Sequence, residues 1–349
     1  MKILVTGGAG YVGSWMVPHL LAAGHKVIVF DIQWFGDGFL SKAGDNENLK
    51  LIVGDIRDLP KLTEALQGIE AVIHLACVSN DHSCQLDEVL STSINFDAFE
   101  PMVIAAKKAG VKRFIYCSSS SVYGISDAPD VFEDAPLVPV TLYNRYKAAC
   151  EPLLFKHQSD DFVCTIIRPA TVCGYAPRMR FDLTVNIITA HAVLKNEITV
   201  FGGAQRRPNL HIKDMTECYK LLLVAPSDKI AGQIFNVGAQ NMKVSDIAEL
   251  VADVVYEEKE GLYPRPTITT QPSTDTRSYH VNSDKIFHVL GFAPKFTVKD
   301  AVRDLCVKFT QGYWKDALTN PLYSNVRQLV EQGFAITDSL ASYRTDRYT

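Results

Sequence analysis

The chain has 349 residues, of which 47% are hydrophobic and 21% charged, with a formal net charge of −4. These proportions are ordinary for a globular protein, and the lack of a basic excess argues against a nucleic-acid partner. No basic leader precedes an apolar segment and no apolar run is long enough to span a bilayer, so we expect a cytoplasmic protein without a membrane partner. The eight cysteines form no C-x-x-C pair, which predicts reduced packing residues and no metal site.

In chain order, the first feature is a glycine-rich turn between an apolar strand and a helix. Residues 1–6 form the strand, and Gly7, Gly10 and Gly13 follow at three-residue spacing. In such a turn the first glycine permits the sharp bend, the second lets the backbone approach a pyrophosphate, and the third lets the helix pack closely on the sheet. The phosphates then face unpaired amides at the helix N-terminus, here those around Tyr11 and Val12.

A second apolar strand, residues 26–30, ends on Asp31. A carboxylate about 20 residues past the glycines is suited to accept hydrogen bonds from the adenosine ribose, and it would repel a 2′-phosphate. The pattern therefore predicts NAD rather than NADP. The alternative is a strand-to-helix turn that binds nothing.

Further strand-like runs alternate with helical patterns, which indicates βαβ units and a parallel sheet. The strands are expected at 49–53, 71–75, 113–117, 164–168 and 233–237, and the helices at 60–68, 96–110, 183–194 and 214–224. A short extended run is expected at 210–212. We therefore predict an α/β protein with a Rossmann-type doubly wound parallel sheet and a smaller α+β C-terminal substrate lobe.

The predicted domain boundaries are placed where the sequence pattern changes, after about residue 170. Residues 1–170 with about 207–238 form the NAD-binding domain, and about 171–206 with 239–310 form the substrate lobe. Residues 311–349 are assigned loosely to C-terminal helices and a tail.

Candidate catalytic residues lie between the fifth and sixth of these strands and at the end of the fifth. Tyr143 and Lys147 share one face of a helix. An adjacent ammonium lowers the pKa of a phenol, and this would let Tyr143 act as a base near neutrality. Four serines, 118–121, follow the strand at 113–117, at the sheet edge where ligands bind. The alternatives are a solvated helix face and a polar loop that caps a turn.

Taken together, these motifs resemble the extended short-chain dehydrogenase/reductase family of nucleotide-sugar epimerases and dehydratases. The matching pieces appear in family order over roughly residues 1 to 300, at 7–13, 31, 54–58, 74–76, 95, 118–124, 143–147, 168–169 and 207–214. The combination is specific for the family and much less so for the reaction.

The resemblance implies a role for each matching residue. Tyr143 would be the base, Lys147 the cation that binds the nicotinamide ribose, and Ser119 the hydroxyl that bonds the reacting sugar oxygen. Cofactor contacts are implied for Gly7, Gly10, Tyr11, Val12, Asp31, Asp55, Ile56, Leu75, Ala76, Asn95, Tyr143, Lys147 and Pro169. Substrate contacts are implied for Asn80, Ser119, Ser120, Arg178, Asn186, Arg207 and Arg277. For these three arginines, and likewise for Arg180, the alternative is a surface salt bridge without a contact to the substrate.

Departures from the family pattern narrow the expected reaction. The 4,6-dehydratases carry Thr-Asp-Glu where this chain has Ser119, Ser120 and Ser121, so a dehydration would lack its general acid and base. Reductases of the family generally use NADPH, which Asp31 disfavours. We therefore expect an NAD-dependent nucleotide-diphosphate-sugar epimerase that passes through a 4-keto sugar. Thr171, where galactose epimerases usually carry Asn, argues against identity with that enzyme.

Two alternatives remain at this stage. The stretch 170–180 also resembles a branch that includes heptose 4-dehydrogenases, so the chain can be a nucleotide-sugar 4-dehydrogenase or a reductase on the same site. A non-catalytic NAD sensor is the alternative from another class, although a sensor has no need of a tuned base. The resemblance also implies a homodimer, with helices around 96–110 and 143–157 at the interface.

Overall fold

The structure is a computed structural model that describes residues 1–36, 40, 46–126, 128–273, 278, 280–314 and 316–334. Its main feature is a seven-stranded sheet in the order β10-β6-β5-β4-β1-β2-β3. Every strand pair in it is parallel. The strands are β1 (Lys2–Thr6), β2 (Lys26–Asp31), β3 (Leu49–Val53), β4 (Ala71–His74), β5 (Arg113–Cys117), β6 (Val163–Pro169) and β10 (Gln233–Val237). The predicted Rossmann-type sheet is confirmed.

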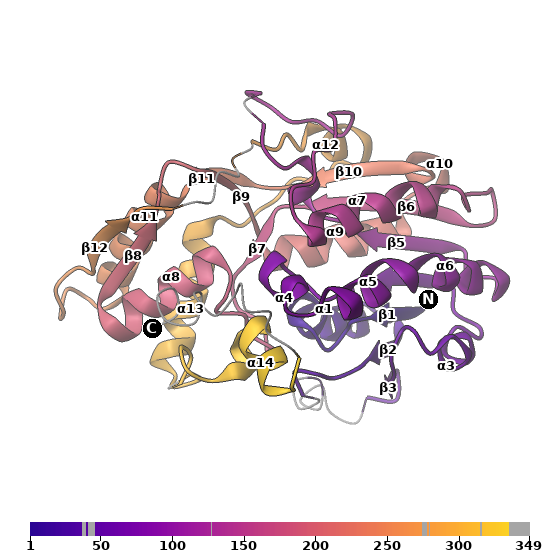
Figure 1. Cartoon of the computed structure of the whole chain (residues 1–349), viewed down its shortest axis with the longest axis horizontal. Coiled ribbons are helices and arrows are strands. Elements are labelled where there is room, and N and C mark those ends of the chain that lie inside the picture. Colours follow the sequence, from indigo (N-terminus) through magenta and orange to yellow (C-terminus); the bar gives the residue numbers. More distant parts are fainter. Residues whose placement is uncertain are drawn as a thin grey trace.

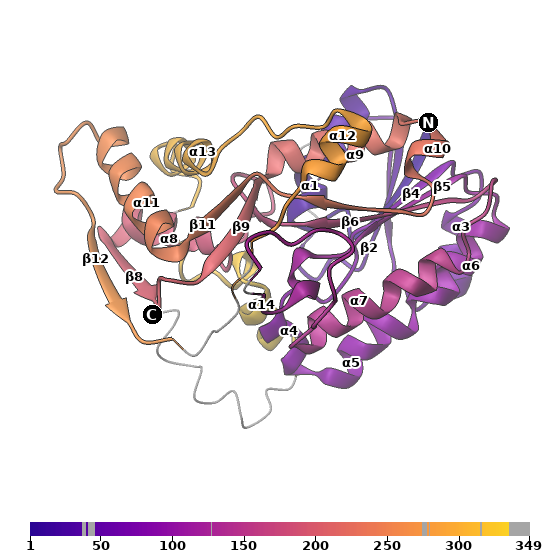
Figure 2. The ribbon, with the colours of Figure 1, turned by 90° about the horizontal axis from the view of Figure 1, so that it is seen from above.

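Helices cover both faces of this sheet, as the view from above shows (Figure 2). One face carries α1 (Tyr11–Ala22), α9 (Ile212–Val224), α10 (Ser227–Ile230) and α12 (Asp284–Leu290). The other carries α3 (Leu59–Ala65), α4 (Asp81–Leu86), α5 (Glu88–Thr92), the π-helical turn η1 (Ser93–Asp97), α6 (Phe99–Lys108) and α7 (Leu142–Phe155). The helix expected over 96–110 is thus divided between η1 and α6.

The apolar strands explain why the sheet is covered on both sides. Alternate residues of a strand point to opposite faces, and in β1 Leu4 packs in the cluster with α3, α6 and α7, whereas Ile3 and Val5 pack in the cluster with α1 and α9. All three side chains are fully buried. Burial on both faces accounts for the nearly continuous apolar runs in the sequence.

A smaller group of elements lies beside the carboxyl edge of the sheet (Figure 1, left). It contains a three-stranded sheet of β7 (Thr171–Cys173), β9 (Arg206–His211) and β11 (Gln240–Lys243), and a two-stranded sheet of β8 (Glu197–Phe201) and β12 (Thr267–Gln271). Its helices are α8 (Thr184–Lys195), α11 (Val244–Glu258) and α13 (Val298–Thr310). β9 is longer than the run expected at 210–212 because β7 and β11 pair with it from both sides. The predicted domain boundaries stay a prediction.

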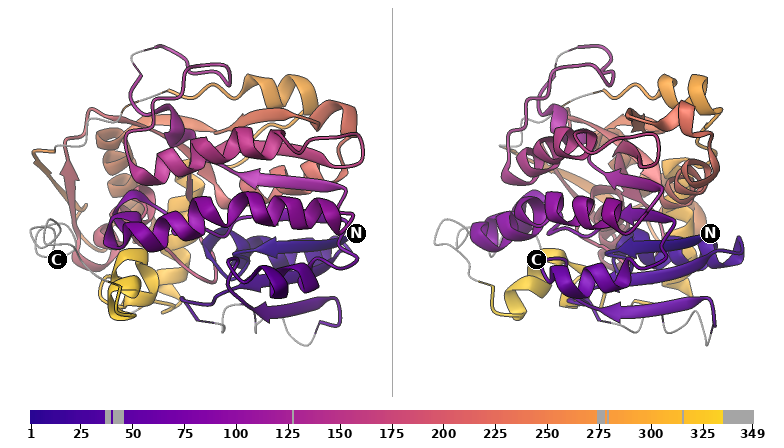
Figure 3. Two further views of the ribbon diagram at one scale, coloured as in Figure 1. Left: turned by 45° about the vertical axis from the view of Figure 1, so that its right-hand side comes forward. Right: turned by 90° about the vertical axis from the view of Figure 1, so that its right-hand side faces the viewer.

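The described C-terminal segment packs against α4 and the loop after β2. After the short turn η3 (Pro321–Tyr323), helix α14 (Asn325–Glu331) contacts α4, and in Figure 3 this yellow segment lies beside the short helices that follow β4. Gln328 and Gln332 donate to the carbonyl oxygen of Trp34, over 2.8 and 2.6 Å. Residues 316–334 therefore cover loops at the carboxyl edge of the sheet. Within the described residues, no helix has both the length and the apolar character needed to cross a membrane.

The buried His74, at the end of β4, predicts how stability depends on pH. Burial, with a smaller contribution from Lys147, lowers the pKa of His74 from 6.5 to about 3. Below pH 6.5 the unfolded chain binds a proton that the folded chain does not. The free energy of unfolding therefore keeps its full value, as far as His74 is concerned, above pH 6.5 and decreases as the pH falls toward 3. One such proton gives a slope of about 1.4 kcal/mol per pH unit in the free energy of unfolding.

We expect His74→Asn to make that slope shallower by up to this amount between pH 6 and pH 4.5, measured by urea unfolding. The asparagine retains a polar partner for Thr6, whose Oγ1 lies 2.7 Å from Nδ1 of His74. Equal slopes for the variant and the wild-type protein would show that His74 does not carry the effect.

Candidate active site

A cleft of about 690 Å³ runs along the carboxyl edge of the main sheet. One wall is formed by the ends of β1, β2, β4, β5 and β6, and the opposite wall by α8, β8 and β9. The cleft therefore joins the two groups of elements, as expected for a ligand site at the strand ends of an open α/β sheet.

The glycine-rich turn lies where the sequence predicts it, between β1 and α1. Gly7 has φ of 71°, and a Cβ added there would lie 2.6 Å from the backbone nitrogen of Ala76. A Cβ at Gly13 would lie 2.4 Å from the carbonyl oxygen of Gly8. Neither position can therefore carry a side chain without moving the backbone. Gly10, Tyr11 and Val12 also line the cleft at the start of α1, which fits a bound pyrophosphate.

Asp31 also lines the cleft, at the end of β2. Its carboxylate accepts hydrogen bonds from the backbone nitrogens of Ala9 at 2.9 Å and Gln33 at 2.8 Å. Burial raises the pKa of Asp31, and these two bonds oppose that shift. The remaining predicted cofactor contacts on the cleft wall are Asp55, Ile56, Leu75, Ala76 and Pro169.

Asn95 does not reach the cleft wall formed by the described residues. Its amide instead pairs with the backbone of Val78, which donates to Oδ1 at 2.8 Å and accepts from Nδ2 at 3.0 Å. Asn95 is 8% exposed. The structure thus corrects the expected cofactor contact: Asn95 holds the loop after β4, which itself faces the cleft.

The three predicted catalytic residues come together on one side of the cleft. Tyr143 and Lys147 lie one turn apart on α7, and Ser119 follows β5. The ammonium of Lys147 donates to the carbonyl oxygen of Cys117 at 2.7 Å. It lies 5.7 Å from the centre of the Tyr143 ring.

The expected lowering of the Tyr143 pKa by Lys147 is not found in the chain alone. Burial raises the pKa of Tyr143 well above 10, and the neighbouring thiols of Cys77 and Cys117 add to the increase. The ammonium cannot offset this because it is bound to Cys117 and faces the ring of Tyr143 rather than bonding its oxygen. A further positive charge in the cleft would favour the phenolate.

A buried ion pair that the sequence reasoning missed anchors α7. Glu151, one turn beyond Lys147, accepts two hydrogen bonds from Arg168 of β6, at 3.0 and 2.6 Å. Both residues are 3% exposed. Ser118 donates to the same carboxylate at 2.6 Å. The four-residue spacing of 143, 147 and 151 was the available signal, since such residues share a helix face.

The serines after β5 form a short chain of hydroxyls. Ser119 Oγ lies 2.7 Å from Ser121 Oγ, and Ser121 donates to Oδ1 of Asn144 at 2.6 Å. Ser119, Ser120 and Ser121 all line the cleft. Ser120 is 2% exposed.

Arg178 lines the cleft close to the dinucleotide elements. Its backbone nitrogen donates to Ser14 Oγ of α1 at 3.1 Å, and its guanidinium lies 3.8 Å from the centre of the Phe35 ring. Nε is buried without a hydrogen-bond partner among the described residues. Burial, helped by the charge of Arg180, lowers the pKa of Arg178 to about 9. An anion at Nε would relieve both costs. These surroundings favour the cofactor side over the substrate side that the resemblance implied.

Asn80 and Arg180 meet at Asp182 across the cleft. Arg180 forms an ion pair with Asp182 at 2.9 Å, and Asn80 Nδ2 donates to the same carboxylate at 3.2 Å. Asn325 of α14 joins the network through its backbone nitrogen and through Ser79. No local sequence signal pointed to Asn325, whose contact with Ser79 spans 246 residues.

The remaining predicted substrate residues, Arg207, Asn186 and Arg277, differ in where they lie. Arg207 lines the cleft. Asn186 is fully buried and binds Gly174, Tyr11 and the Arg180 carbonyl, so the expected nucleotide contact is corrected to a supporting role behind Tyr11. Arg277 lies outside the described residues.

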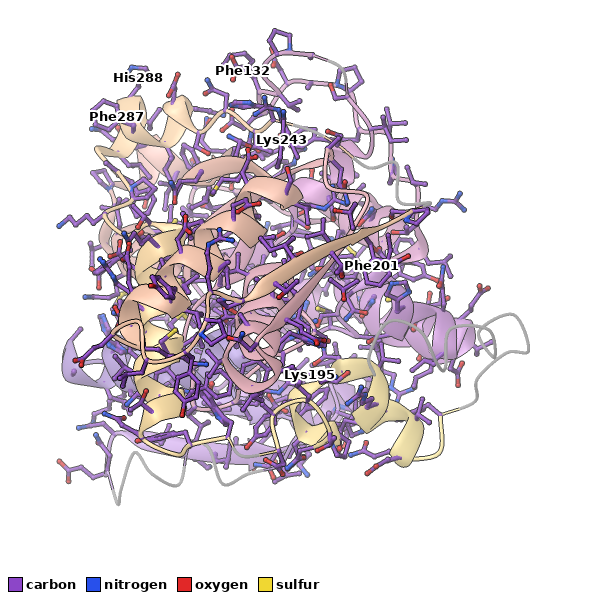
Figure 4. The ribbon with its side chains drawn as sticks, turned by 90° about the vertical axis from the view of Figure 1, so that its left-hand side faces the viewer. Phe132, Lys195, Phe201, Lys243, Phe287 and His288 are labelled. Atoms are coloured by element: carbon purple, nitrogen blue, oxygen red, sulfur yellow. The ribbon has the colours of Figure 1, made fainter. Side chains whose placement is uncertain are left out.

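The second wall contains residues that the sequence did not single out. Lys195 at the end of α8 and Phe201 at the end of β8 line the cleft with His191. Figure 4 shows Lys195 on the lower part of the molecule and Phe201 near its middle, both away from Phe132, Phe287 and His288 at the upper edge. No group of three or more His, Cys, Asp or Glu among the described residues is arranged to hold a metal ion.

Fold and cleft together define a dinucleotide-binding α/β enzyme. The family model described as "NAD dependent epimerase/dehydratase family" matches residues 3–238, and the chain belongs to this family. Its cofactor is NAD, which the glycine turn and Asp31 fit.

Similar proteins include enzymes of two reaction types. The chain is 27% identical over 330 residues to dTDP-D-glucose 4,6-dehydratase of Mus musculus, covering 90% of this chain and 91% of the relative. It is 28% identical over 310 residues to UDP-glucose 4-epimerase of Mycolicibacterium smegmatis, covering 86% and 96%. The solved structure of MoeE5 in complex with UDP-glucuronic acid and NAD is similar, with 26% identity, a TM-score of 0.75 and coverage of 89% and 100%.

Asp31→Ala tests the cofactor preference. A hydrogen bond to a charged group contributes about 1.5–3 kcal/mol, so we expect NAD to bind roughly 10- to 100-fold more weakly. NADP should bind more tightly than to the wild-type protein because the like charge is gone. Isothermal titration with both cofactors measures the ratio, and an unchanged ratio would contradict a ribose contact by Asp31.

Proposed function

We propose that this enzyme is an NAD-dependent nucleotide-diphosphate-sugar epimerase that acts through a transient 4-keto sugar. The observation that supports this best is the group formed by Tyr143, Lys147 and Ser119 at the cleft, with serines at 120 and 121. This arrangement supplies a proton acceptor and hydroxyl donors at one point. It offers no carboxyl group at positions 120 and 121, where the 4,6-dehydratases of the family carry their general acid and base.

The proposed steps use these side chains as follows. Tyr143 takes the proton of the C4 hydroxyl, and Ser119 donates a hydrogen bond to the same oxygen. Bound NAD would supply a hydride acceptor for C4 and a positive charge that favours the phenolate. Lys147 holds the nicotinamide ribose. After the keto sugar turns over in the cleft, Tyr143 returns the proton, and the C4 centre is inverted without net redox change.

The charged residues of the cleft divide between the two ligands in this proposal. Arg178 would bind the diphosphate of NAD, because it lies beside α1 and carries an unpaired Nε within the described part of the chain. Arg207, on the opposite wall, would bind the diphosphate of the substrate. A guanidinium suits both, since its donors form a planar fork.

The activity is tested by incubating the NAD-loaded protein with UDP-glucose, UDP-glucuronic acid and dTDP-glucose. Neighbouring structures carry UDP-glucuronic acid and UDP-glucose with NAD, which makes these the first candidates. The proposal predicts a 4-epimer and no accumulation of reduced cofactor.

Other products distinguish the alternatives. A 4-keto sugar with equimolar NADH indicates the 4-dehydrogenase, including one for heptoses, and consumption of NADH with a keto sugar indicates a reductase. A 4-keto-6-deoxy sugar indicates a dehydratase. Bound NAD with no product from any nucleotide sugar would favour the sensor.

Tyr143→Phe should abolish turnover because it removes the only oxygen of the proposed base. NAD binding should stay within about twofold, since the ring remains in place. Tyr146→Phe is the matched control: its hydroxyl pairs with Thr92 of α5 at 2.7 Å, and Tyr146 is not among the described residues that line the cleft. Activity in Tyr143→Phe comparable to that of Tyr146→Phe would remove Tyr143 from the mechanism.

We also propose a cytoplasmic homodimer in which α6 and α7 pack against the partner. These two helices lie side by side on one face of the main sheet (Figure 2). Sedimentation equilibrium should give twice the chain mass of 38.7 kDa. A monomer at micromolar concentration would contradict the dimer.

A further inference from the structure

Asn144, the residue after the proposed base, has an unusual environment. Its side chain is 0% exposed. Oδ1 accepts a hydrogen bond from Ser121, whereas Nδ2 has no partner among the described residues. A buried unpaired donor costs about 1–3 kcal/mol. Such a group in a folded protein calls for an explanation beyond packing.

The hydroxyls of Ser121 and Ser119 extend from Asn144 into the cleft. Each hydroxyl has one hydrogen to donate, so the group at the end of the chain decides the direction of every bond. With Oδ1 of Asn144 toward Ser121, Ser121 donates to Asn144 and Ser119 donates to Ser121. Ser119 then presents only lone pairs to the cleft.

A half-turn of the Asn144 amide reverses this order. The oxygen and nitrogen of an asparagine side chain exchange places in such a turn with little change in shape. Nδ2 then donates to Ser121, Ser121 donates to Ser119, and the hydrogen of Ser119 points into the cleft. The 2.7 Å between the two serine oxygens suits either direction, and the 2.6 Å from Ser121 Oγ to the amide has to lengthen by only about 0.1 Å when nitrogen takes the place of oxygen.

This inference rests on the proposed function, whose chemistry requires the second order of bonds, in which Ser119 donates its hydrogen into the cleft. The C4 oxygen gives its proton to Tyr143 and becomes a carbonyl oxygen, which only accepts hydrogen bonds. Ser119 must therefore donate to it in both half-reactions, and such a donor is worth most where negative charge develops.

We propose that Asn144 is a positioning residue whose amide, donating to Ser121, directs the hydrogen of Ser119 toward the reacting sugar oxygen. Asn144 touches neither ligand and acts through Ser121 and Ser119. Asn144 follows Tyr143 on α7. The residue that accepts the substrate proton and the residue that orients the Ser119 hydroxyl are therefore neighbours in the sequence.

The test compares Asn144→Asp with Asn144→Ala, using the nucleotide sugar that the wild-type enzyme converts. An ionised carboxylate only accepts, so Asn144→Asp fixes the chain in the unproductive direction, and kcat should fall by about 100-fold with KM within twofold. Asn144→Ala leaves Ser121 free to donate to Ser119 and should lose less. A purely structural role predicts the opposite order, because aspartate keeps the shape and the acceptor for Ser121 whereas alanine leaves a cavity.

The pH profile adds a readout that packing would not move. A protonated carboxyl can donate, so kcat of Asn144→Asp relative to the wild-type enzyme should rise as the pH falls. Two charged groups lie near the start of α7: Asp81, which accepts a hydrogen bond from Thr141, and Lys147, one turn further on. Both are present in the variant and in the wild-type enzyme, so their effects cancel in this ratio. A flat ratio, or Asn144→Ala as the slower variant, would overturn the inference.

Ser121 gives a second route if either Asn144 variant fails to fold. Ser121→Ala interrupts the chain and should lower kcat by roughly tenfold, and Ser121→Thr, which keeps the hydroxyl, should restore it. Loss of kcat in both Ser121 variants, or in neither, would contradict the chain. A wild-type enzyme that converts no nucleotide sugar would instead refute the proposed function, and this inference with it.

Discussion

The arrangement of the active site depends on one buried ion pair, between Glu151 of α7 and Arg168 of β6. Removing one partner of such a pair leaves an uncompensated buried charge and typically costs about 3–5 kcal/mol. Through Ser118 the same carboxylate also holds the end of β5. The pair therefore fixes the helix that carries Tyr143 and Lys147 relative to the strand end that carries Ser119.

Burial around this anchor also determines the protonation states. It raises the pKa of Tyr143 and lowers that of Arg178, so the chain by itself disfavours both charges. Opposite charges on two parts of NAD, the cationic nicotinamide and the anionic diphosphate, would offset these costs. The electrostatics of the cleft therefore suit bound NAD, as does its shape.

Much of the fold was predictable because its signals are local. A parallel strand buried on both faces must be apolar throughout, and Gly7, Gly13 and Asp31 stand at a spacing that a dinucleotide-binding turn imposes on the sequence. The directions of Asn95 and Asn186 were not predictable, since their partners were unknown until the chain was folded. The network at Asn325 joins residues 79, 182 and 325. The spacing of Tyr143 and Lys147 gives proximity on a helix face, but it does not reveal that the ammonium binds the carbonyl oxygen of Cys117 or that burial raises the pKa of Tyr143 in the chain alone.

The central claim is that hydride leaves C4 of the sugar and returns to the same carbon within one binding event. The most direct measurement uses the nucleotide sugar labelled with deuterium at C4, converted in ordinary water and examined by NMR. The account predicts that the 4-epimer keeps its deuterium at C4 and that the rate shows a primary isotope effect. Loss of the label from C4, or hydrogen from water appearing at that carbon, would contradict it.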